Sequence, residues 1–474
     1  MRPAVVRSSL QWRDPEAVVR HLAATGDVVW RDAGVAATRG RSVVGRGPAR
    51  TGDVRDGGAD RPWPEGRDDR ADAEPDRHPP GGAGRPGHGF GCRLLDRDAT
   101  GGPRPAAAAS TVAADGDPAD LALLDVDRAL VCDHAARSVE AVARVGDPWP
   151  RSVAETWADV PPEPPVPGPT RASSEGSASP SVRWRHRPDE YLDLIEGCRR
   201  AIAAGEAYQL CLTTAVDVDG PVDALEAFAH LRRSSPAPHA SFVRIGDVAV
   251  VGASPESFVE GTTGGRVAAS PLKGTRRRGS GVDDPVLARE LVESDKERAE
   301  NVMIVDLVRN DLARVARLGT VEVSELLAVH SYEHVHQLVS TVRARLGAGC
   351  TAADVVEAAF PAGSMTGAPK RRAVELLADL EGAPRGVSSG ATGWLGRGGS
   401  AGLAMTIRSI VVHGARAASA GRPARPAGAR VGVGGGITIS SVPVDERDEV
   451  ELKASALLAV LGVRAADGAP VRMS

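Results

Sequence analysis

Two segments with helical periodicity carry glutamates three residues apart, a spacing that places each pair on one helix face. The pairs are Glu297 with Glu300 and Glu446 with Glu449. Four such carboxylates could bracket a hard divalent cation, because Mg²⁺ prefers oxygen ligands and keeps some of its water. A solvated acidic face is the commoner reason for glutamate pairs, so the spacing alone leaves both interpretations open.

A lysine in a short segment bounded by turn residues is a second candidate for chemistry. Lys273 lies in SPLKGT, close to a proline and directly before a glycine. Such a lysine is usually solvated, and with an ordinary pKa of about 10.4 it is almost wholly protonated at neutral pH. A chemical role therefore requires surroundings that favour the free amine, through desolvation or a nearby cation.

Two loops and one arginine have the chemistry to bind anionic groups. In FPAGSMTGAPKRR, residues 360–372, a loop leads into a helix whose free amides near Gly367 suit an anion, although every helix start has such amides. The glycines of GVGGGIT, residues 432–438, permit close approach of a ligand, but they lead into a strand-like run, which excludes a dinucleotide-binding loop. We expect Arg408 to lie inside an apolar strand, where a buried guanidinium needs a carboxylate from the protein or from a ligand.

Length, charge and cysteine usage limit the class of protein. The chain has 474 residues and a net charge of −4, which favours two domains or one large α/β unit and gives no basic surface for nucleic acid or anionic membrane. The five cysteines show no CxxC pair and no zinc spacing, which fits a reducing compartment. No apolar run approaches the roughly 20 residues of a membrane span, and the first residues lack a signal peptide. We therefore expect a cytoplasmic protein.

The elements that must position these residues divide the chain into an N-terminal region (1–159), a Pro- and Ser-rich linker (160–183) and a patterned domain (184–465). Residues 45–88 carry too few large apolar side chains to offset their ordering entropy, so we expect disorder there or a stretch translated out of frame. Residues 284–318 have the pattern of one or two long helices. Helices and strands mix without a regular βαβ rhythm, which predicts an α+β fold with antiparallel sheets.

Taken together, the motifs resemble those of the chorismate-utilising enzymes, which include anthranilate synthase component I, aminodeoxychorismate synthase component I, and the isochorismate and salicylate synthases. The resemblance covers residues 184–463. It rests, in family order, on GEAYQL, SPESF, PLKGT, DKERAENVMIVDLVRNDLARV, QLVSTV, FPAGSMTGAPKRRAVELL, IRS, GVGGGIT and DERDEVELK. It implies a large two-sheet antiparallel α/β sandwich of the anthranilate synthase component I type.

The resemblance also implies roles for individual residues. A Mg²⁺ site that holds one chorismate carboxylate would be formed by Glu297, Glu300, Glu446 and Glu449. The other carboxylate would be bound by Arg408 and the amides near Gly435 and Gly436. Glu256 would be the general acid that protonates the departing 4-hydroxyl. The substrate site would be completed by Gln209, Thr275, Thr366, Gly367 and Lys453.

Two positions favour one chemistry within the family. Water-adding members carry a lysine base where this chain has Gln209, and a glutamine cannot deprotonate water. Anthranilate synthases carry a small residue at position 273, whereas aminodeoxychorismate synthases carry the lysine. By resemblance, Lys273 would attack chorismate C2 while Glu256 protonates the leaving 4-hydroxyl. Ammonia would then attack C4 and expel the lysine, giving 4-amino-4-deoxychorismate for p-aminobenzoate, and so for folate or a natural product.

The source of ammonia and the departures from the family pattern complete the expectations. No cysteine lies in the glycine-rich elbow of a glutaminase triad, so we expect a separate glutamine amidotransferase subunit. The family's usual histidine, tyrosine and two aspartates are replaced here by Gln337, Ser388, Gly402 and Ser440. Such losses could weaken substrate positioning or the surroundings of the metal. Two alternatives therefore stay open: anthranilate synthase component I, and a catalytically degenerate homologue.

Overall fold

Helices and two antiparallel sheets make up the described part of the chain, as the sequence predicts. The computed structural model describes residues 5–23, 26–33, 37, 40–52, 90–95, 121–170, 180–281, 283–332, 335–396, 398–415, 425–463 and 471–473. Most of the stretch expected to be disordered or out of frame lies outside these residues, whereas 45–52 contribute to two strands. No helix in the described part is both long and apolar enough to span a membrane.

The first sheet has twelve strands in the described residues. From edge to edge it is formed by β1 (Val5–Leu10), β8 (Ser138–Arg144), β7 (Arg128–Asp133), β3 (Arg41–Arg46), β2 (Val28–Arg31), β11 (His239–Ile245), β12 (Val248–Ser254), β21 (Ser409–His413), β22 (Gly428–Ile437), β10 (Gln209–Asp219) and β18 (Gly367–Ala368), and β9 (Val182–Trp184) pairs with β10. The sheet is continuous from the N-terminal region to the later part of the chain, because β2 pairs with β11.

The second sheet has ten strands in the described residues. Its order is β15 (Leu272–Arg277), β17 (Val335–Arg345), β14 (Arg266–Ser270), β13 (Ser257–Gly261), β20 (Ala401–Met405), β19 (Ala391–Gly396), β5 (Phe90–Leu95), β6 (Leu121–Val126) and β4 (Ala49–Gly52), and β16 (Glu322–Ser331) pairs with β17. The edge strand β15 carries Lys273, one of the candidate functional residues.

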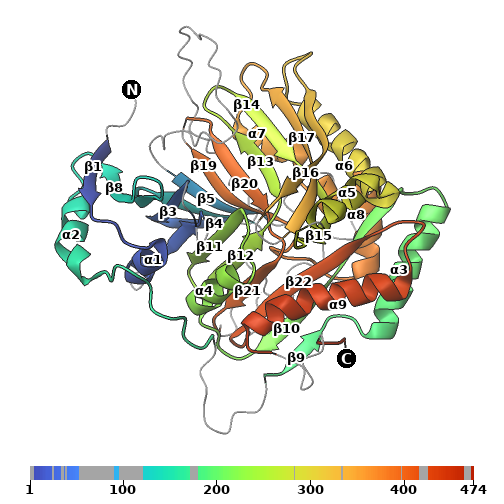
Figure 1. Ribbon diagram of the computed structural model, residues 1–474, viewed down its shortest axis with the longest axis horizontal. Helices are drawn as coiled ribbons and strands as arrows, with labels where there is room; N and C mark the ends of the chain where they lie inside the picture. Colours follow the sequence, from blue (N-terminus) through green and yellow to red (C-terminus); the bar gives the residue numbers. More distant parts are fainter. Residues whose placement is uncertain are drawn as a thin grey trace.

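Nine α-helices lie in the described residues (Figure 1). They are α1 (Pro15–Ala23), α2 (Trp149–Thr156), α3 (Pro188–Ala203), α4 (Ala224–Ser234), α5 (Asp283–Glu293), α6 (Asp295–Ala313), α7 (Ala352–Ala359), α8 (Lys370–Glu381) and α9 (Pro443–Val460). In Figure 1, α9 lies along β22 of the first sheet, and α6 packs on β17 of the second. The predicted long helical stretch is two helices, because the hydroxyl of Ser294 accepts the amide of Glu297 and so caps a new start.

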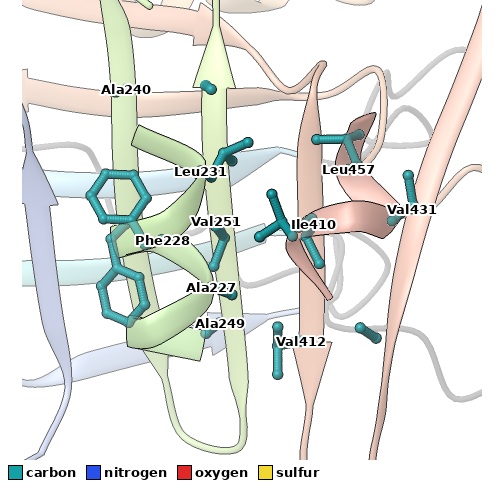
Figure 2. Close-up of a cluster of buried hydrophobic side chains, with 14 of the residues drawn as sticks. Ala227, Phe228, Leu231, Ala240, Ala249, Val251, Ile410, Val412, Val431 and Leu457 are labelled. Carbon is teal, nitrogen blue, oxygen red and sulfur yellow. The ribbon is translucent and has the colours of Figure 1, made fainter. Parts of the chain in front are cut away.

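The main core lies between the first sheet and its covering helices. Figure 2 shows Phe228 and Leu231 of α4, Val251 of β12 and Leu457 of α9 among its side chains. Successive strand residues point to opposite faces of a sheet. Val431 on β22 therefore packs into this core, while Gly436 lies on the opposite face, where a Cβ would lie 3.7 Å from Nζ of Lys273 in the second sheet. Burying each large apolar side chain contributes about 1.5–3 kcal/mol.

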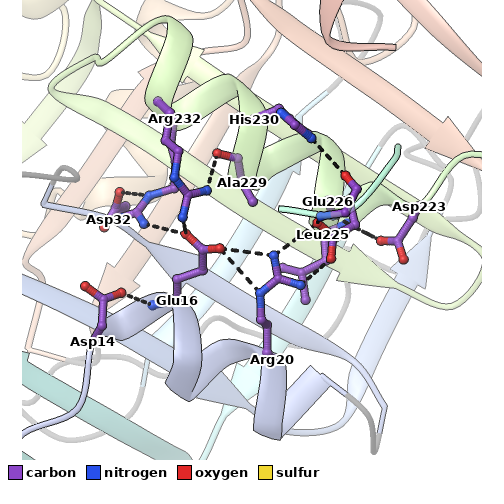
Figure 3. A network of polar contacts seen from close by, with 12 residues as sticks. Asp14, Glu16, Arg20, Asp32, Asp223, Leu225, Glu226, Ala229, His230 and Arg232 are labelled. Atoms are coloured by element: carbon purple, nitrogen blue, oxygen red, sulfur yellow. Dashed lines mark hydrogen bonds and ion pairs between the residues drawn. The ribbon is translucent and has the colours of Figure 1, made fainter. Parts of the chain in front are cut away.

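A buried ionic network ties α1 to α4 (Figure 3). Arg232 of α4 donates to Glu16 of α1 at 2.9 Å and to Asp32, just after β2, at 2.8 Å. Arg20 bridges Glu16 and Glu226. Because Arg232, Glu16 and Asp32 are almost wholly buried, the network connects the N-terminal region to the sheet that carries the site.

Candidate active site

The candidate site lies where the chain crosses from one sheet to the other. It crosses between β12 and β13, next to Glu256, and again between β20 and β21, next to Arg408. The two crossings are bonded to each other: the amide of Met405 donates to the carbonyl of Glu256, and the amide of Ala253 donates to the carbonyl of Arg408, both at 3.1 Å. The fold therefore holds these two functional candidates at a shared junction of the sheets.

The expectation that Arg408 is buried inside an apolar strand was wrong. The stretch 404–413 is divided between β20 and β21, and Arg408 has a φ of 47° at the crossing. Its side chain is exposed, although enough protein surrounds it for desolvation to lower its pKa. No carboxylate among the described residues pairs with it. An arginine in such a position suits an anionic ligand.

Lys273 meets residues of the first sheet and of α6. Its side chain is 15% exposed, and its Nζ lies 3.7 Å from Oε2 of Glu300. Nε2 of Gln209, at the start of β10, lies 3.4 Å from the same oxygen. The Oε1 of Gln209 is buried and has no hydrogen-bond partner among the described residues. A buried polar atom without a partner is costly, so a ligand or water is the expected partner for this oxygen.

Glycine at position 436 lets β22 approach these side chains. A Cβ there would lie 2.2 Å from Nε2 of Gln209 and 3.7 Å from Nζ of Lys273. Gly435 faces the opposite side, where a Cβ would lie 3.4 Å from Oε2 of Glu446 on α9. The glycine run therefore brings bare backbone between Lys273 and Glu446.

The amide of Gly436 points to an open edge of β22. Gly436 is opposite Cys211 on β10, but the amide of Cys211 donates to Thr366 on the other side. In an antiparallel pair, a residue pair without cross-strand bonds directs its polar groups outward. On that side β21 pairs with β22 only as far as Val431 in the described residues. The amide of Gly436 is thus available to a ligand.

Glu256 has the protonation behaviour that a general acid needs. The residue is 5% exposed, and burial raises the pKa of its carboxyl to about 7. A hydrogen bond from Ser364, the charge of Lys273 and the amide of Leu272 oppose this rise. A carboxyl with a pKa near the working pH is partly protonated and can still donate its proton.

The two glutamate pairs lie on helices that face each other. Glu297 and Glu300 belong to α6, and Glu446 and Glu449 belong to α9. Glu446 is buried and accepts a hydrogen bond of 2.7 Å from Ser441. Burial raises the pKa of Glu300, although the charges of two lysines oppose that rise. The sequence could not show that the helices face each other, but it correctly paired the residues on each helix.

Lys296 of α6 lies among these carboxylates. Its Nζ is 3.5 Å from Oε1 of Glu446. Burial acts to lower the pKa of Lys296, but carboxylates outweigh it and the pKa is raised. In decreasing order of effect, the carboxylates that do so are Glu446, Glu300, Glu449 and Glu297. The charges of all four carboxylates therefore act on this ammonium.

The donor set fits Mg²⁺ in its chemistry. Four carboxylates on two helices supply the oxygen ligands and negative charge that this ion requires. In the described residues, no three acidic, histidine or cysteine side chains converge closely enough to hold an ion as they stand. A metal could be held only after these carboxylates move closer together, and in this structure the ammonium of Lys296 lies 3.5 Å from Glu446.

The other residues predicted to bind substrate differ in their burial and in their contacts. Thr366 is fully buried and its hydroxyl donates to Ala362 at 3.1 Å. The expectation of free helix amides near Gly367 was wrong, because Gly367 belongs to β18, paired with β10, and α8 begins only at Lys370. Lys453 pairs with Glu449 at 2.8 Å and donates to the carbonyl of Gly434 at 3.1 Å.

Thr275 and the positions that depart from the family pattern have contacts with neighbouring strands and side chains. Thr275 pairs with Gln337 across β15 and β17, beyond an irregularity in the pairing. Ser388 packs against Gly432 of β22, where a Cβ would lie 2.0 Å from its Oγ. A Cβ on Gly402 would lie 2.6 Å from the indole nitrogen of Trp394, so that ring fills the space. The hydroxyl of Ser440 bonds that of Thr438 at 3.1 Å.

Two residues of the site were missed by sequence reasoning. Ser364 lies in the FPAGS motif and hydrogen-bonds Glu256, and Lys296 directly precedes Glu297. Both lie inside motifs that the sequence analysis had identified, and this position was a signal that they could belong to the site. Their contacts depend on other elements, however, and no spacing within the motif indicates them.

Comparisons with known proteins identify the family of this chain. Residues 33–459 match the model of the chorismate binding enzyme family. An aminodeoxychorismate synthase of Streptomyces griseus is 42% identical over 361 residues, which cover 73% of this chain and 48% of that protein. Anthranilate synthase component 1 of Methanothermobacter thermautotrophicus is 39% identical over 269 residues, covering 56% of this chain and 55% of that protein. The chain thus spans about half the length of these relatives.

A solved structure shows the same architecture. Anthranilate synthase component I from Streptococcus pneumoniae TIGR4 superposes with a TM-score of 0.65 at 25% identity, and the match covers 80% of this chain and 83% of that one. The large two-sheet antiparallel sandwich predicted from the motifs is therefore confirmed. With a family match over most of its length and the residues of the motifs gathered at one junction, this chain belongs to the chorismate binding enzyme family.

Proposed function

We propose that this chain aminates chorismate to 4-amino-4-deoxychorismate, using ammonia from a separate glutamine amidotransferase subunit. The observation that carries the proposal is the position of Lys273. It lies beside Glu300, Gln209 and Gly436, and its charge acts on the carboxyl of Glu256. The name of the Streptomyces griseus relative supports this assignment over anthranilate formation.

The first step needs Lys273 as a free amine. Its Nζ forms a bond to C2 of chorismate, the ring double bonds shift, and the C4–O bond breaks. Glu256 gives its proton to the departing oxygen, so the hydroxyl leaves as water. The pKa of about 7 means that the acid is substantially protonated near neutral pH.

The second step removes the lysine. Ammonia forms a bond to C4, the double bonds return to their original places, and the bond from C2 to Nζ of Lys273 breaks. The proton lost by ammonia passes to a base, for which the carboxylate of Glu256 is suited after it has given up its own proton. Product and lysine are then both restored without an oxidant or reductant.

Gln209 restricts the chemistry to amination. Its amide lies in the site next to Lys273, with its Oε1 free of partners among the described residues. An amide accepts or donates hydrogen bonds but has no basic lone pair for activating water. Hydroxylated products, as made by isochorismate synthases, are therefore not expected.

Substrate binding uses both ends of the site. The exposed guanidinium of Arg408 and the outward amide of Gly436 suit one carboxylate of chorismate. A Mg²⁺ ion, held by Glu297, Glu300, Glu446 and Glu449, would supply the positive charge for the other carboxylate. Lys273 lies 3.7 Å from Glu300, and a Cβ on Gly436 would lie 3.7 Å from its Nζ, so the groups proposed for the two carboxylates both border the amine.

Product analysis tests the proposal. Purified protein is incubated with chorismate, Mg²⁺ and ammonium at mildly alkaline pH, and the products are separated by mass and retention, with Lys273→Ala alongside. Aminodeoxychorismate from the wild type and its loss in the variant are expected. Anthranilate from the wild type would contradict the role of Lys273. Binding of chorismate without turnover would favour the degenerate homologue.

A further inference from the structure

The place that a metal would take among the four carboxylates is faced by a lysine ammonium. Lys296 lies 3.5 Å from Glu446 across the gap between α6 and α9. We infer that Lys296 is the internal counter-ion of the metal-free site, and that Mg²⁺ binds by displacing it. The inference rests on the proposed Mg²⁺ site and adds to it a competitor built into the chain.

Lys296 is the movable partner in this cluster. Its side chain is 52% exposed, whereas that of Glu446 is 7% exposed. Ser441 holds Glu446 in place by donating a hydrogen bond of 2.7 Å to its Oε1. A flexible four-carbon stem allows the ammonium to swing into water, while the buried Glu446 stays in place.

The other two lysines near the cluster are less suited to displacement. Lys273 is 15% exposed, faces Glu300 at 3.7 Å, and is the proposed nucleophile. Lys453 is held twice, by Glu449 at 2.8 Å and by the carbonyl of Gly434 at 3.1 Å. Lys296 alone in this group combines high exposure with attraction to all four carboxylates among the described residues.

Electrostatics explains why such a counter-ion is needed. Four carboxylates carried by two helices repel one another, and the cost grows with burial. A lysine supplies one positive charge in the absence of metal, which stabilises the fold. Mg²⁺ would supply two.

The test compares Mg²⁺ binding by the whole chain and three variants, without chorismate, using calorimetry at fixed pH and ionic strength. Lys296→Gln removes the competing charge, so Mg²⁺ should bind about ten-fold more tightly, equal to about 1.4 kcal/mol. Lys296→Arg keeps the charge and should not bind more tightly than the wild type. The matched control is Arg276→Gln, because Arg276 pairs with Glu297 at 3.8 Å from outside the gap.

A second measurement separates competition from misfolding. Without metal, Lys296→Gln should unfold at a lower temperature than the wild type, because the carboxylates lose their counter-ion. Saturating Mg²⁺ should raise its midpoint by more than it raises that of the wild type, since the stabilisation grows with affinity. Unfolding of the variant at the wild-type temperature without metal would contradict the inference.

The calorimetry has three further decisive outcomes. Unchanged or weaker Mg²⁺ binding by Lys296→Gln would overturn the inference and make Lys296 a residue that organises the ligands. An equal gain in Arg276→Gln would also overturn it, because only the net charge would then matter. If neither the wild type nor any variant binds Mg²⁺, the metal site itself fails. Lys273-dependent amination is measured separately by product analysis and would be unaffected by that failure.

Discussion

Replacing Glu256 by glutamine should stabilise the folded protein at alkaline pH. Burial raises the pKa of this carboxyl from 4.5 to about 7. Because each pKa unit corresponds to about 1.4 kcal/mol, ionised Glu256 costs the fold about 3 kcal/mol once the pH exceeds both values. Glutamine has the same shape and no charge, so the variant avoids this cost.

The sign follows from proton binding. Between about pH 4.5 and pH 7 the folded protein retains a proton on Glu256 that the unfolded chain has lost, so the contribution of this group to stability falls as the pH rises. It is fully present below about pH 4.5 and lost above about pH 7. The variant should therefore gain about 3 kcal/mol over the wild type between these limits.

Urea denaturation at about pH 4.5 and about pH 8 measures this difference. All other titrating groups are shared by the two proteins, so only Glu256 should change the gap between them. The matched control is Glu260→Gln, because Glu260 is exposed on β13, the strand that begins directly after Glu256. A gap between wild type and Glu256→Gln that does not vary with pH would refute the argument that the site holds this acid protonated.

Three other changes test separate parts of the site and fold. Gly436→Val should raise the KM for chorismate at least about ten-fold, because even a Cβ would lie 2.2 Å from Nε2 of Gln209. An unchanged KM would show that β22 does not face the substrate. Arg408→Gln should lose about 1.5–3 kcal/mol of substrate binding, measured as a rise in KM, with no fall in unfolding temperature, since it has no carboxylate partner among the described residues. Arg232→Ala should cost about 3–5 kcal/mol in urea denaturation, because it leaves buried Glu16 and Asp32 uncompensated; a loss below about 1 kcal/mol would contradict this account of the network.

Local patterns in the sequence were sufficient to predict the helices. They were also sufficient to predict which residues share one face of a helix. The spacing of Glu297 and Glu300 correctly indicated one helix face, and the stretch expected to form one or two long helices forms two, which divide at Ser294. The motifs also indicated the fold, because the order of SPESF, PLKGT and GVGGGIT is a property of the family. These features depend on residues close together in the chain or on resemblance.

Features that depend on contacts between distant elements could not be predicted. Arg408 looked like part of an apolar strand because hydrophobic residues flank it on both sides, but that strand changes sheets at this point. The sequence around Gly367 indicated the start of a helix, but Gly367 belongs to a short strand that pairs with β10. The ion pair of Lys296 could not be predicted either, because its partner Glu446 is far away in the sequence.

The most direct test of the central claim is the mass of the peptide that contains Lys273 after incubation with chorismate and Mg²⁺ in the absence of ammonia. Without the second nucleophile, the first covalent bond should remain. The account predicts that Lys273 carries the mass of chorismate less one water, and that adding ammonium releases aminodeoxychorismate and restores the free lysine. An unmodified Lys273 in protein that aminates chorismate when ammonium is added would contradict the covalent route.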